Sequence, residues 1–250
     1  MRCERYDLFE PLVIGATERV FVLTGAGVSA ESGLSTFRDA NGLWNEHRVE
    51  EIASPAGWAR DPQLVWQFYS QRRAKLAGVE PNAAHIALGR IERELGERFF
   101  LCTQNVDDLH ERGGSTRVLH MHGELRRSRC ERCDRPSFVD QQLYETLDAI
   151  AHCECGARLR PHICWFGEVP FEMDRIVAAL DQCDVFITIG SSGVVYPAAQ
   201  FVARAKSRVG VRAIYVGPEE PDNAYSFDEC RLGTAVQAVP GLFRVGAFRA

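Results

Sequence analysis

The sequence lacks any run of about 18 apolar residues, the length that a membrane-spanning helix needs. Its first residues, MRCERYDLFEPL, lack the apolar core of a secretory signal. It also lacks an excess of basic residues, because 29 lysines and arginines stand against 34 aspartates and glutamates, which gives a net charge of −5. These absences argue against membrane and nucleic-acid partners, and they predict a cytoplasmic protein. The oligomeric state stays open.

A disulfide framework is not indicated, since the nine cysteines are odd in number and no secretory signal is recognised. Four of them lie within 26 residues, as two close pairs with 19 residues between the pairs. Pairs at about this spacing are typical of a tetrahedral structural zinc site, although the second pair is C-x-C rather than C-x-x-C. The predicted ligands are Cys130, Cys133, Cys153 and Cys155, with His152 as an alternative. Four thiolates leave zinc no open position, so we predict a structural metal.

Short apolar runs alternate with helical patterns along the chain, which predicts a parallel α/β sheet covered on both faces. We expect strands at Arg19–Thr24, Arg98–Thr103, Asp184–Ile189 and Val211–Val216, with a weaker candidate at Val236–Val239. We expect helices at Gln63–Ala77, Asn82–Leu95, Glu172–Gln182 and Ala198–Lys206. In such folds, ligands bind beyond the carboxyl ends of the strands.

Two stretches interrupt this alternation. Residues 41–80 are helical with no strand signal, and residues 124–160 are polar and hold the cysteine cluster. We predict that these two insertions together form a small helical and zinc-binding domain. Residues 1–40, 81–123 and 161–250 then form the larger α/β domain.

A glycine-rich turn, GAGVSAESG (25–33), follows the first predicted strand. Glycine lets the backbone approach a phosphate closely, and the N-terminus of a following helix offers free N–H groups. The turn therefore suits a pyrophosphate, although its spacing is not the usual G-x-G-x-x-G. A tight turn without a ligand is the alternative. Arg38, a little farther on, could pair with phosphate or form a surface ion pair.

Polar side chains crowd the carboxyl end of the second predicted strand, in TQNVDDLH (103–110). An α/β protein places its binding site at this edge. The alternative is helix capping, with Asn105 as the N-cap and Asp107 or Asp108 in the first turn. Capping explains Gln104 poorly.

Two histidines follow the next apolar stretch, in VLHMHGE (118–124). Histidine titrates near neutrality and is the usual general base, so His122 is a candidate for that role. His120 is a rival, and a lone histidine is more often structural.

These motifs together resemble the sirtuin family from about residue 20 to residue 200. The segments that carry the resemblance are GAGVSAESGLSTFRD (25–39), TQNVDDLHERGG (103–114), MHGEL (121–125), the four cysteines, PHICWFGE (161–168) and GSSGVVYPAA (190–199). Their order is more specific than any one of them. The resemblance implies a Rossmann-like NAD-binding domain, a smaller zinc domain, and a cleft between them where NAD meets an acyl-lysine peptide.

The resemblance also implies roles for individual residues. The cofactor site would be lined by Gly25, Ala26, Gly27, Ser29, Ala30, Phe37, Arg38, Gly190, Ser191 and Ser192. Gln104, Asn105 and Asp107 would hold nicotinamide and its ribose, the last two with a catalytic role, and His122 would be the general base. The substrate would meet Ile163, Trp165, Phe166 and Gly167. The implied reaction removes an acyl group from a protein lysine and gives nicotinamide and O-acyl-ADP-ribose.

The helix expected at Gln63–Ala77 indicates which acyl group is removed. Arg72 falls on its apolar stripe, where it either extends past apolar neighbours to solvent or faces an anion in a pocket. Tyr69 stands three residues earlier, so Tyr69 and Arg72 can bind one carboxylate, and Arg73 fits almost as well by geometry alone. Sirtuins that remove succinyl, malonyl or glutaryl groups carry this Y-x-x-R, and the resemblance therefore favours Arg72.

The chain departs from the family pattern in three places. Ser35 stands where proline is usual, Gly217 stands where an asparagine usually holds the adenosine ribose, and the tail 227–242 matches poorly. The adenosine half of NAD is therefore expected to have different contacts or to bind more weakly. An NAD glycohydrolase or ADP-ribosyltransferase is the rival enzyme, and a zinc-ribbon binding module without catalysis is the rival of another class.

Overall fold

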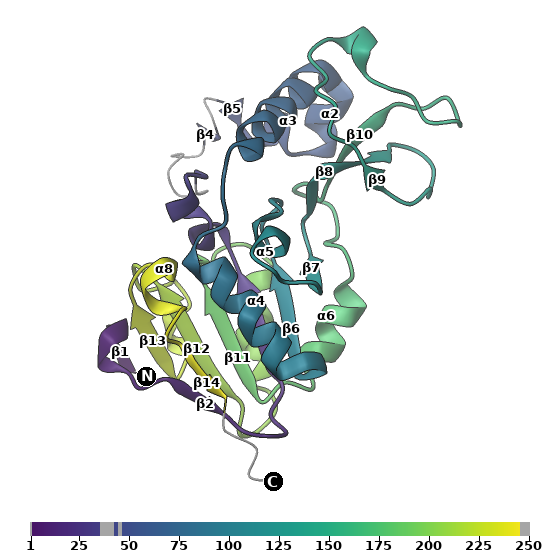
Figure 1. Cartoon of the computed structure of the whole chain (residues 1–250). Coiled ribbons are helices and arrows are strands. Elements are labelled where there is room, and N and C mark those ends of the chain that lie inside the picture. The colour runs from purple at the N-terminus through teal and green to yellow at the C-terminus, as the bar shows by residue number, and fades with distance from the viewer. Residues whose placement is uncertain (1, 36–42, 45–46, 246–250) are drawn as a thin grey trace.

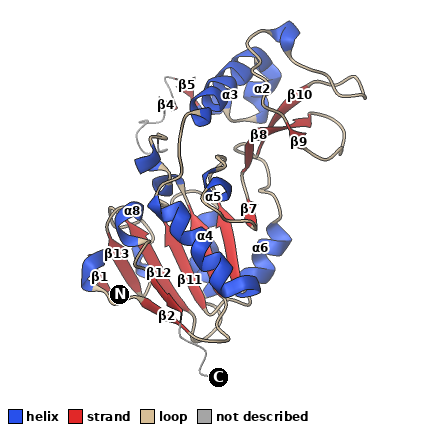
Figure 2. Cartoon of the chain, viewed as in Figure 1, coloured by secondary structure: helices blue, strands red, loops and turns tan. Residues whose placement is uncertain are grey.

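The computed structural model describes residues 2–35, 43–44 and 47–245, and its largest element is a parallel sheet of seven strands (Figures 1 and 2). Every pair of neighbouring strands in this sheet runs parallel. Across the sheet the order is β1 (Arg2–Arg5), β13 (Glu229–Leu232), β12 (Arg212–Gly217), β11 (Val185–Ile189), β3 (Val20–Thr24), β6 (Phe99–Thr103) and β7 (Val118–His120). The predicted fold class, a Rossmann-like parallel sheet, is confirmed.

The central strands are buried on both faces, which is why they appear in the sequence as continuous apolar runs. All five residues of β3 and all five of β11 are buried. Successive side chains point to opposite faces, so Val20 and Val22 pack in one core while Phe21 and Leu23 pack in the other. The four strands that we predicted with most support are confirmed as β3, β6, β11 and β12.

Helices cover both faces of the sheet. The first face carries α4 (Ala83–Leu95) and α8 (Ala235–Ala238), and the second carries α6 (Met173–Leu180) and α7 (Phe201–Ala205). Asn82 begins α4, because its side-chain oxygen accepts a hydrogen bond from the N–H of Ala84 at 3.0 Å. The predicted helices at 82–95, 172–182 and 198–206 are confirmed with small changes of bounds, and the last of them starts as a 3-10 turn.

The weak strand that we predicted at Val236–Val239 is wrong, because this segment forms α8. The backbone N–H of Thr234 donates to Gln237 Oε1 at 3.1 Å, and this local capping favours a helical turn. The sheet is instead extended by β13 and β1, which carry charged residues and left no apolar run. A separate parallel pair joins β2 (Leu12–Ile14) to β14 (Phe243–Val245).

A smaller unit lies beyond the carboxyl edge of the large sheet, at the top of Figure 1. Its antiparallel sheet has the order β10 (Leu159–Ile163), β8 (Gly123–Cys130) and β9 (Phe138–Val139). Its helices are α1 (Val49–Ile52), α2 (Pro55–Arg60) and α3 (Pro62–Ala77). A core of its own includes Trp66, Tyr69 and Trp165.

Helix α3 confirms the helix predicted at Gln63–Ala77, and it starts at Pro62 after the N-cap Asp61. The segment 41–80 also contains β4 (Leu43–Trp44) and β5 (His47–Arg48), so our expectation of no strand there is wrong. Strands of two residues are too short to leave a periodic pattern. The domain boundaries stay a prediction. Within the described residues, no helix is long and apolar enough to cross a membrane.

Candidate active site

A cavity of about 390 Å³ lies between the carboxyl ends of the central strands and the smaller unit. It brings together every predicted cofactor and substrate residue that the structure describes. The loops after the large-sheet strands supply Gly25, Ala26, Gly27, Ser29, Ala30, Gln104, Asn105, Asp107, His122, Gly190, Ser191 and Ser192. The smaller unit supplies Tyr69, Arg72, Ile163, Trp165, Phe166 and Gly167. The predicted residues Phe37 and Arg38 lie outside the described residues.

The glycine-rich turn packs directly against the loop after β11. The N–H of Gly27 donates to the carbonyl of Gly190 at 2.9 Å, and a Cβ added to Gly27 would lie 2.8 Å from Gly190 Cα. Only glycine fits there, and its backbone lines the cavity, as close contact with a dinucleotide requires. The helix that we expected to follow is replaced by two 3-10 turns, Ala26–Val28 and Ala30–Ser32, and Gly33 ends the second with φ 94°.

Ser29 holds the polar cluster together. Its Oγ accepts a hydrogen bond from Asn105 Nδ2 and donates one to Asp107 Oδ2, both at 3.1 Å. The Nδ1 of His85 accepts from the N–H of Asn82, so the neutral ring carries its proton on Nε2 and donates it to Ser29 Oγ at 3.3 Å. Burial lowers the pKa of His85 to about 4, which keeps this donor neutral.

Asn105 is not the N-cap that we weighed as an alternative, because α5 (Leu109–Arg112) begins after Asp108 and the Asn105 amide points to Ser29. The capping alternative is right for one oxygen of Asp107, because Oδ1 accepts a hydrogen bond from the N–H of Leu109, the first residue of α5, at 3.2 Å. Burial raises the pKa of Asp107, and its hydrogen bonds only partly oppose this.

Gln104 joins two of the loops that line the cavity. Its Nε2 donates to Ser191 Oγ at 3.0 Å, which links the loop after β6 to the loop after β11. Its carbonyl oxygen lies 3.1 Å from His122 Nδ1. Since a carbonyl can only accept, His122 Nδ1 carries a proton, and in the neutral ring Nε2 is left as the basic nitrogen.

The structure separates the two candidate histidines. His122 lines the cavity, and burial lowers its pKa, so the ring is neutral near pH 7. His120 is absent from the cavity wall: its Nδ1 contacts the carbonyl of Asn105 at 3.0 Å and its Nε2 lies 2.8 Å from Glu111 Oε1. The geometry therefore favours His122 as the group that can accept a proton from a bound molecule.

Tyr69 and Arg72 both belong to the part of the cavity wall that α3 forms. Tyr69 is buried, and its hydroxyl accepts a hydrogen bond from Trp165 Nε1 at 3.0 Å. The Arg72 guanidinium lies 5.7 Å from the centre of the Phe68 ring, and burial lowers its pKa. Arg72 thus faces the cavity rather than extending past apolar neighbours to solvent. Of the two predicted aromatic substrate contacts, Trp165 is buried and Phe166 is half exposed.

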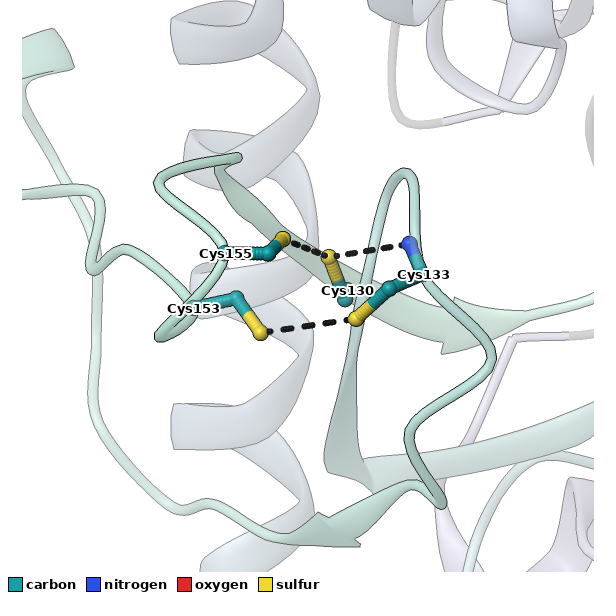
Figure 3. Close-up of side chains that lie close together, drawn as sticks. All are labelled: Cys130, Cys133, Cys153 and Cys155. Atoms are coloured by element: carbon teal, nitrogen blue, oxygen red, sulfur yellow. Dashed lines mark hydrogen bonds between the residues drawn. The ribbon is translucent and has the colours of Figure 1, made fainter.

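The four predicted cysteine ligands meet at one end of β8 (Figure 3). Their sulfur atoms all lie within 4.8 Å of one another, with 3.5 Å between Cys130 and Cys155 and 3.7 Å between Cys133 and Cys153. Zinc–sulfur bonds of about 2.3 Å in a tetrahedron require sulfur separations of roughly 3.8 Å, so the cluster fits zinc. The alternative ligand His152 lies outside the cluster and forms a β-bridge with Arg158.

Sequence reasoning missed several residues of the cavity wall: Glu31, Tyr215, Pro218 and Thr234. Tyr215 and Gly217 share one face of β12, and a Cβ added to Gly217 would lie 2.2 Å from the Tyr215 hydroxyl. The glycine that departs from the family pattern therefore makes room for a tyrosine hydroxyl. Its departure was the signal that could have pointed to Tyr215.

The chain is similar to known proteins over most of its length. The sequence model of the family described as the Sir2 family matches residues 25–197. An NAD-dependent protein deacylase of Caulobacter vibrioides is 51% identical over 225 residues, which cover 89% of this chain and 94% of that protein. One of Shewanella oneidensis is 49% identical over 227 residues, covering 90% and 93%. A solved Sir2 homologue–NAD complex superposes with a TM-score of 0.82 at 42% identity, covering 91% and 89%.

Proposed function

The chain belongs to the Sir2 family, and on this premise we propose that it removes succinyl and malonyl groups, and acetyl groups as well, from the lysine side chains of proteins. It is an NAD-dependent protein-lysine deacylase. The proposed co-products are nicotinamide and O-acyl-ADP-ribose. We also propose that it acts on proteins in the cytoplasm, without a nucleic-acid or membrane partner.

The observation that carries the acyl preference is the pair Tyr69 and Arg72 in the cavity wall. A guanidinium and a phenolic hydroxyl one helical turn apart offer two donors to one carboxylate. An acetyl group ends in a methyl group, has no carboxylate, and leaves these donors unused. A succinyl or malonyl group ends in a carboxylate and engages them, so it binds with an added charge-assisted interaction.

NAD fits the part of the cavity that the loops after β3, β6 and β11 form. The glycine backbone of residues 25–27 would hold the pyrophosphate, Gln104, Asn105 and Asp107 the nicotinamide ribose, and Ser191 and Ser192 the adenosine half. When bound, NAD supplies the ribose carbon to which the acyl oxygen is transferred and nicotinamide as the leaving group. The Asp107 carboxylate and the neighbouring amides can stabilise positive charge that develops there.

His122 is the proposed general base. Its Nδ1–H is held by the carbonyl of Gln104, which orients the ring and leaves Nε2 to take a proton from a hydroxyl group in the cavity. Backbone groups from Ile163 to Gly167 would hold the substrate peptide, and the half-exposed Phe166 would cover the acyl chain. A neutral imidazole and a cavity closed by the smaller unit suit this proton transfer.

The test compares kcat/KM on one peptide that carries acetyl-lysine, butyryl-lysine or succinyl-lysine, with NAD, while peptide and nicotinamide are both followed by mass. Butyryl matches succinyl in length but lacks the carboxylate. The Arg72→Met variant should lose roughly 30-fold or more on succinyl, because breaking a buried charge-assisted pair costs about 2–5 kcal/mol. It should keep its activity on acetyl and butyryl groups.

Lys75→Ala is the matched control, since Lys75 is an exposed cation on the same helix. It should change none of the three rates. Equal loss on all three substrates in Arg72→Met would overturn the acyl preference. Nicotinamide release without any change in the peptides would make the protein an NAD glycohydrolase, and nicotinamide release with a gain of mass on the peptide would make it an ADP-ribosyltransferase.

A further inference from the structure

Trp165 makes a hydrogen bond to a cavity residue in addition to its packing in the core. The residue is 2% exposed and packs in the core of the smaller unit, where its ring lies 5.9 Å from that of Trp58. Its indole Nε1 also donates a hydrogen bond of 3.0 Å to the hydroxyl oxygen of Tyr69. This bond joins the segment after β10 to helix α3 at the cavity wall.

The direction of this hydrogen bond is fixed by chemistry. An indole nitrogen can only donate, so the Tyr69 oxygen must accept. The phenolic O–H prefers the ring plane, on one side of the oxygen or the other, and it avoids the side from which another donor approaches that oxygen. The Tyr69 proton is then left to point to the other side. Burial raises the pKa of Tyr69 to about 12, so the proton stays on the oxygen at neutral pH.

The indole is itself held in place from two directions. The Arg160 guanidinium lies 3.4 Å from the centre of the Trp165 ring and pairs with both oxygens of Glu168 at 2.7 and 3.0 Å. The same carboxylate accepts the backbone N–H of Trp165 at 2.8 Å. The backbone and the ring of Trp165 thus both contact one largely buried ion pair, and the indole cannot turn away from Tyr69 without losing its contact with Arg160.

We propose that Trp165 is a positioning residue for acyl selectivity: by occupying the acceptor side of the Tyr69 hydroxyl, its indole N–H directs the tyrosine proton into the cavity, toward the carboxylate of an acidic acyl group. The inference rests on the proposed preference for acidic acyl groups and goes beyond it. A Tyr69 that can only donate favours an acyl terminus that can only accept. Together with Arg72 it makes this part of the cavity selective for a carboxylate.

The test is a double-mutant cycle with Trp165→Phe and Tyr69→Phe, measured as the ratio of kcat/KM for succinyl-lysine to that for acetyl-lysine on one peptide. Tyr69→Phe should lower this ratio roughly 10-fold, as expected for losing a hydrogen bond to a charged group, and Trp165→Phe roughly 5-fold. In the Tyr69→Phe background, Trp165→Phe should lower the ratio no further. That non-additivity is the signature of a residue that acts through Tyr69, and a merely structural role does not produce it.

Two controls separate the donor from the bulk of the ring. Trp58→Phe removes a neighbouring buried indole whose N–H bonds Glu131 at 2.8 Å and which is absent from the cavity wall, so it should leave the ratio unchanged. Replacing Trp165 with 3-benzothienylalanine keeps a bicyclic ring for Arg160 and removes only the N–H. It should lower the ratio as Trp165→Phe does, and it decides the question if Trp165→Phe does not fold.

An unchanged ratio in the benzothienyl variant, or an equal further fall in the Tyr69→Phe background, would overturn the proposal. Failure of the acidic-acyl preference itself has a different signature. In that case the unmodified protein favours acetyl over succinyl, and Arg72→Met leaves the ratio where it was.

Discussion

Arg72 and Arg73 are neighbours on helix α3, yet their guanidinium groups enter different parts of the molecule. Arg72 lines the cavity. Arg73 turns into the smaller unit, where it donates to the carbonyls of Leu125 at 2.7 Å and of Gln142 at 2.7 Å, and its Nη1 lies 3.5 Å from Asp140 Oδ2. Its side chain is 3% exposed, so the ion pair with Asp140 is buried. We therefore propose that Arg72 serves binding and that Arg73 serves stability.

Arg73→Met should therefore lower the free energy of unfolding by about 3–5 kcal/mol, because it leaves a buried carboxylate without its partner. The ratio of succinyl to acetyl activity should stay as it is. Denaturant unfolding and peptide kinetics on the same sample check both parts. A changed ratio with unchanged stability would mean that the two arginines have been assigned the wrong way round.

The same pair of arginines shows how much of the site can be predicted from the sequence. Helix geometry places both Arg72 and Arg73 near Tyr69, and only the resemblance to a family chose between them. What separates them is the set of carbonyls that Arg73 satisfies on β8 and after β9, and these come from residues more than fifty positions away. Long-range hydrogen bonds of this kind leave no local pattern in the sequence.

The strands divide in a similar way. The buried central strands β3 and β11 have uninterrupted apolar runs and were predictable. Strand β13, next to the edge strand β1, carries Glu229 and Arg231, which pair with each other, and Arg231 is buried. A strand that carries charged residues has no apolar run, so its sequence predicts a loop even where those charges are paired inside the fold. The buried Ser29–His85 contact was equally invisible, because it joins residues from separate elements.

His122 should set the acid limb of the pH profile. The general base must be neutral, and burial lowers its pKa, so activity should rise with pH through a value below the ordinary histidine pKa of about 6.5 and be flat at neutral pH. His122→Ala should lower kcat roughly 100-fold or more. A profile of kcat/KM against pH checks this, and an acid limb above pH 6.5 would contradict a buried neutral base.

Removing the zinc should unfold the smaller unit. Cys133→Ser takes away one of four thiolates whose sulfur atoms lie within 4.8 Å of one another, and binding energy at such a site is folding energy. The variant should lose bound zinc and melt at a lower temperature. Cys3→Ser, which changes a cysteine outside the cluster, is the control and should keep the metal. A verified zinc-free protein with an unchanged melting temperature would mean that the metal plays no part in stability.

His85 should make the protein sensitive to mild acid. Its folded pKa is about 4 against about 6.5 unfolded, so the unfolded chain binds the extra proton first. Its contribution to stability is fully present above pH 6.5 and is lost as the pH falls from 6.5 toward 4, by at most roughly 3 kcal/mol.

The non-titrating His85→Gln variant isolates this effect, because the buried His110, whose ring centre lies 5.0 Å away, also has a lowered pKa and remains in both proteins. Between pH 6.5 and 4, the melting temperature of the unmodified protein should fall more steeply than that of His85→Gln. Parallel pH profiles for the two proteins would show that protonation of His85 is not coupled to unfolding.

Tyr215 should contribute to the binding of NAD, at the place where this chain lacks the asparagine of the family pattern. Its hydroxyl lies over Gly217 at the carboxyl end of β12, in the cavity wall that also holds Ser191 and Ser192. Tyr215→Phe keeps the ring, which packs edge-on against Phe227, and removes only the hydroxyl. The KM for NAD should rise roughly 3- to 10-fold, as for one lost hydrogen bond, while the KM for the peptide stays unchanged.

Gly217→Ala reaches the same hydroxyl by another route, because its Cβ would lie 2.2 Å from that oxygen and must displace it. It should raise the KM for NAD in the Tyr215 protein and have little further effect in Tyr215→Phe, where the oxygen is already gone. If Gly217→Ala is equally harmful in both backgrounds, the glycine is required by the backbone and not by the tyrosine. If neither substitution changes the KM for NAD, the adenosine half is held by the serines after β11 without help from β12.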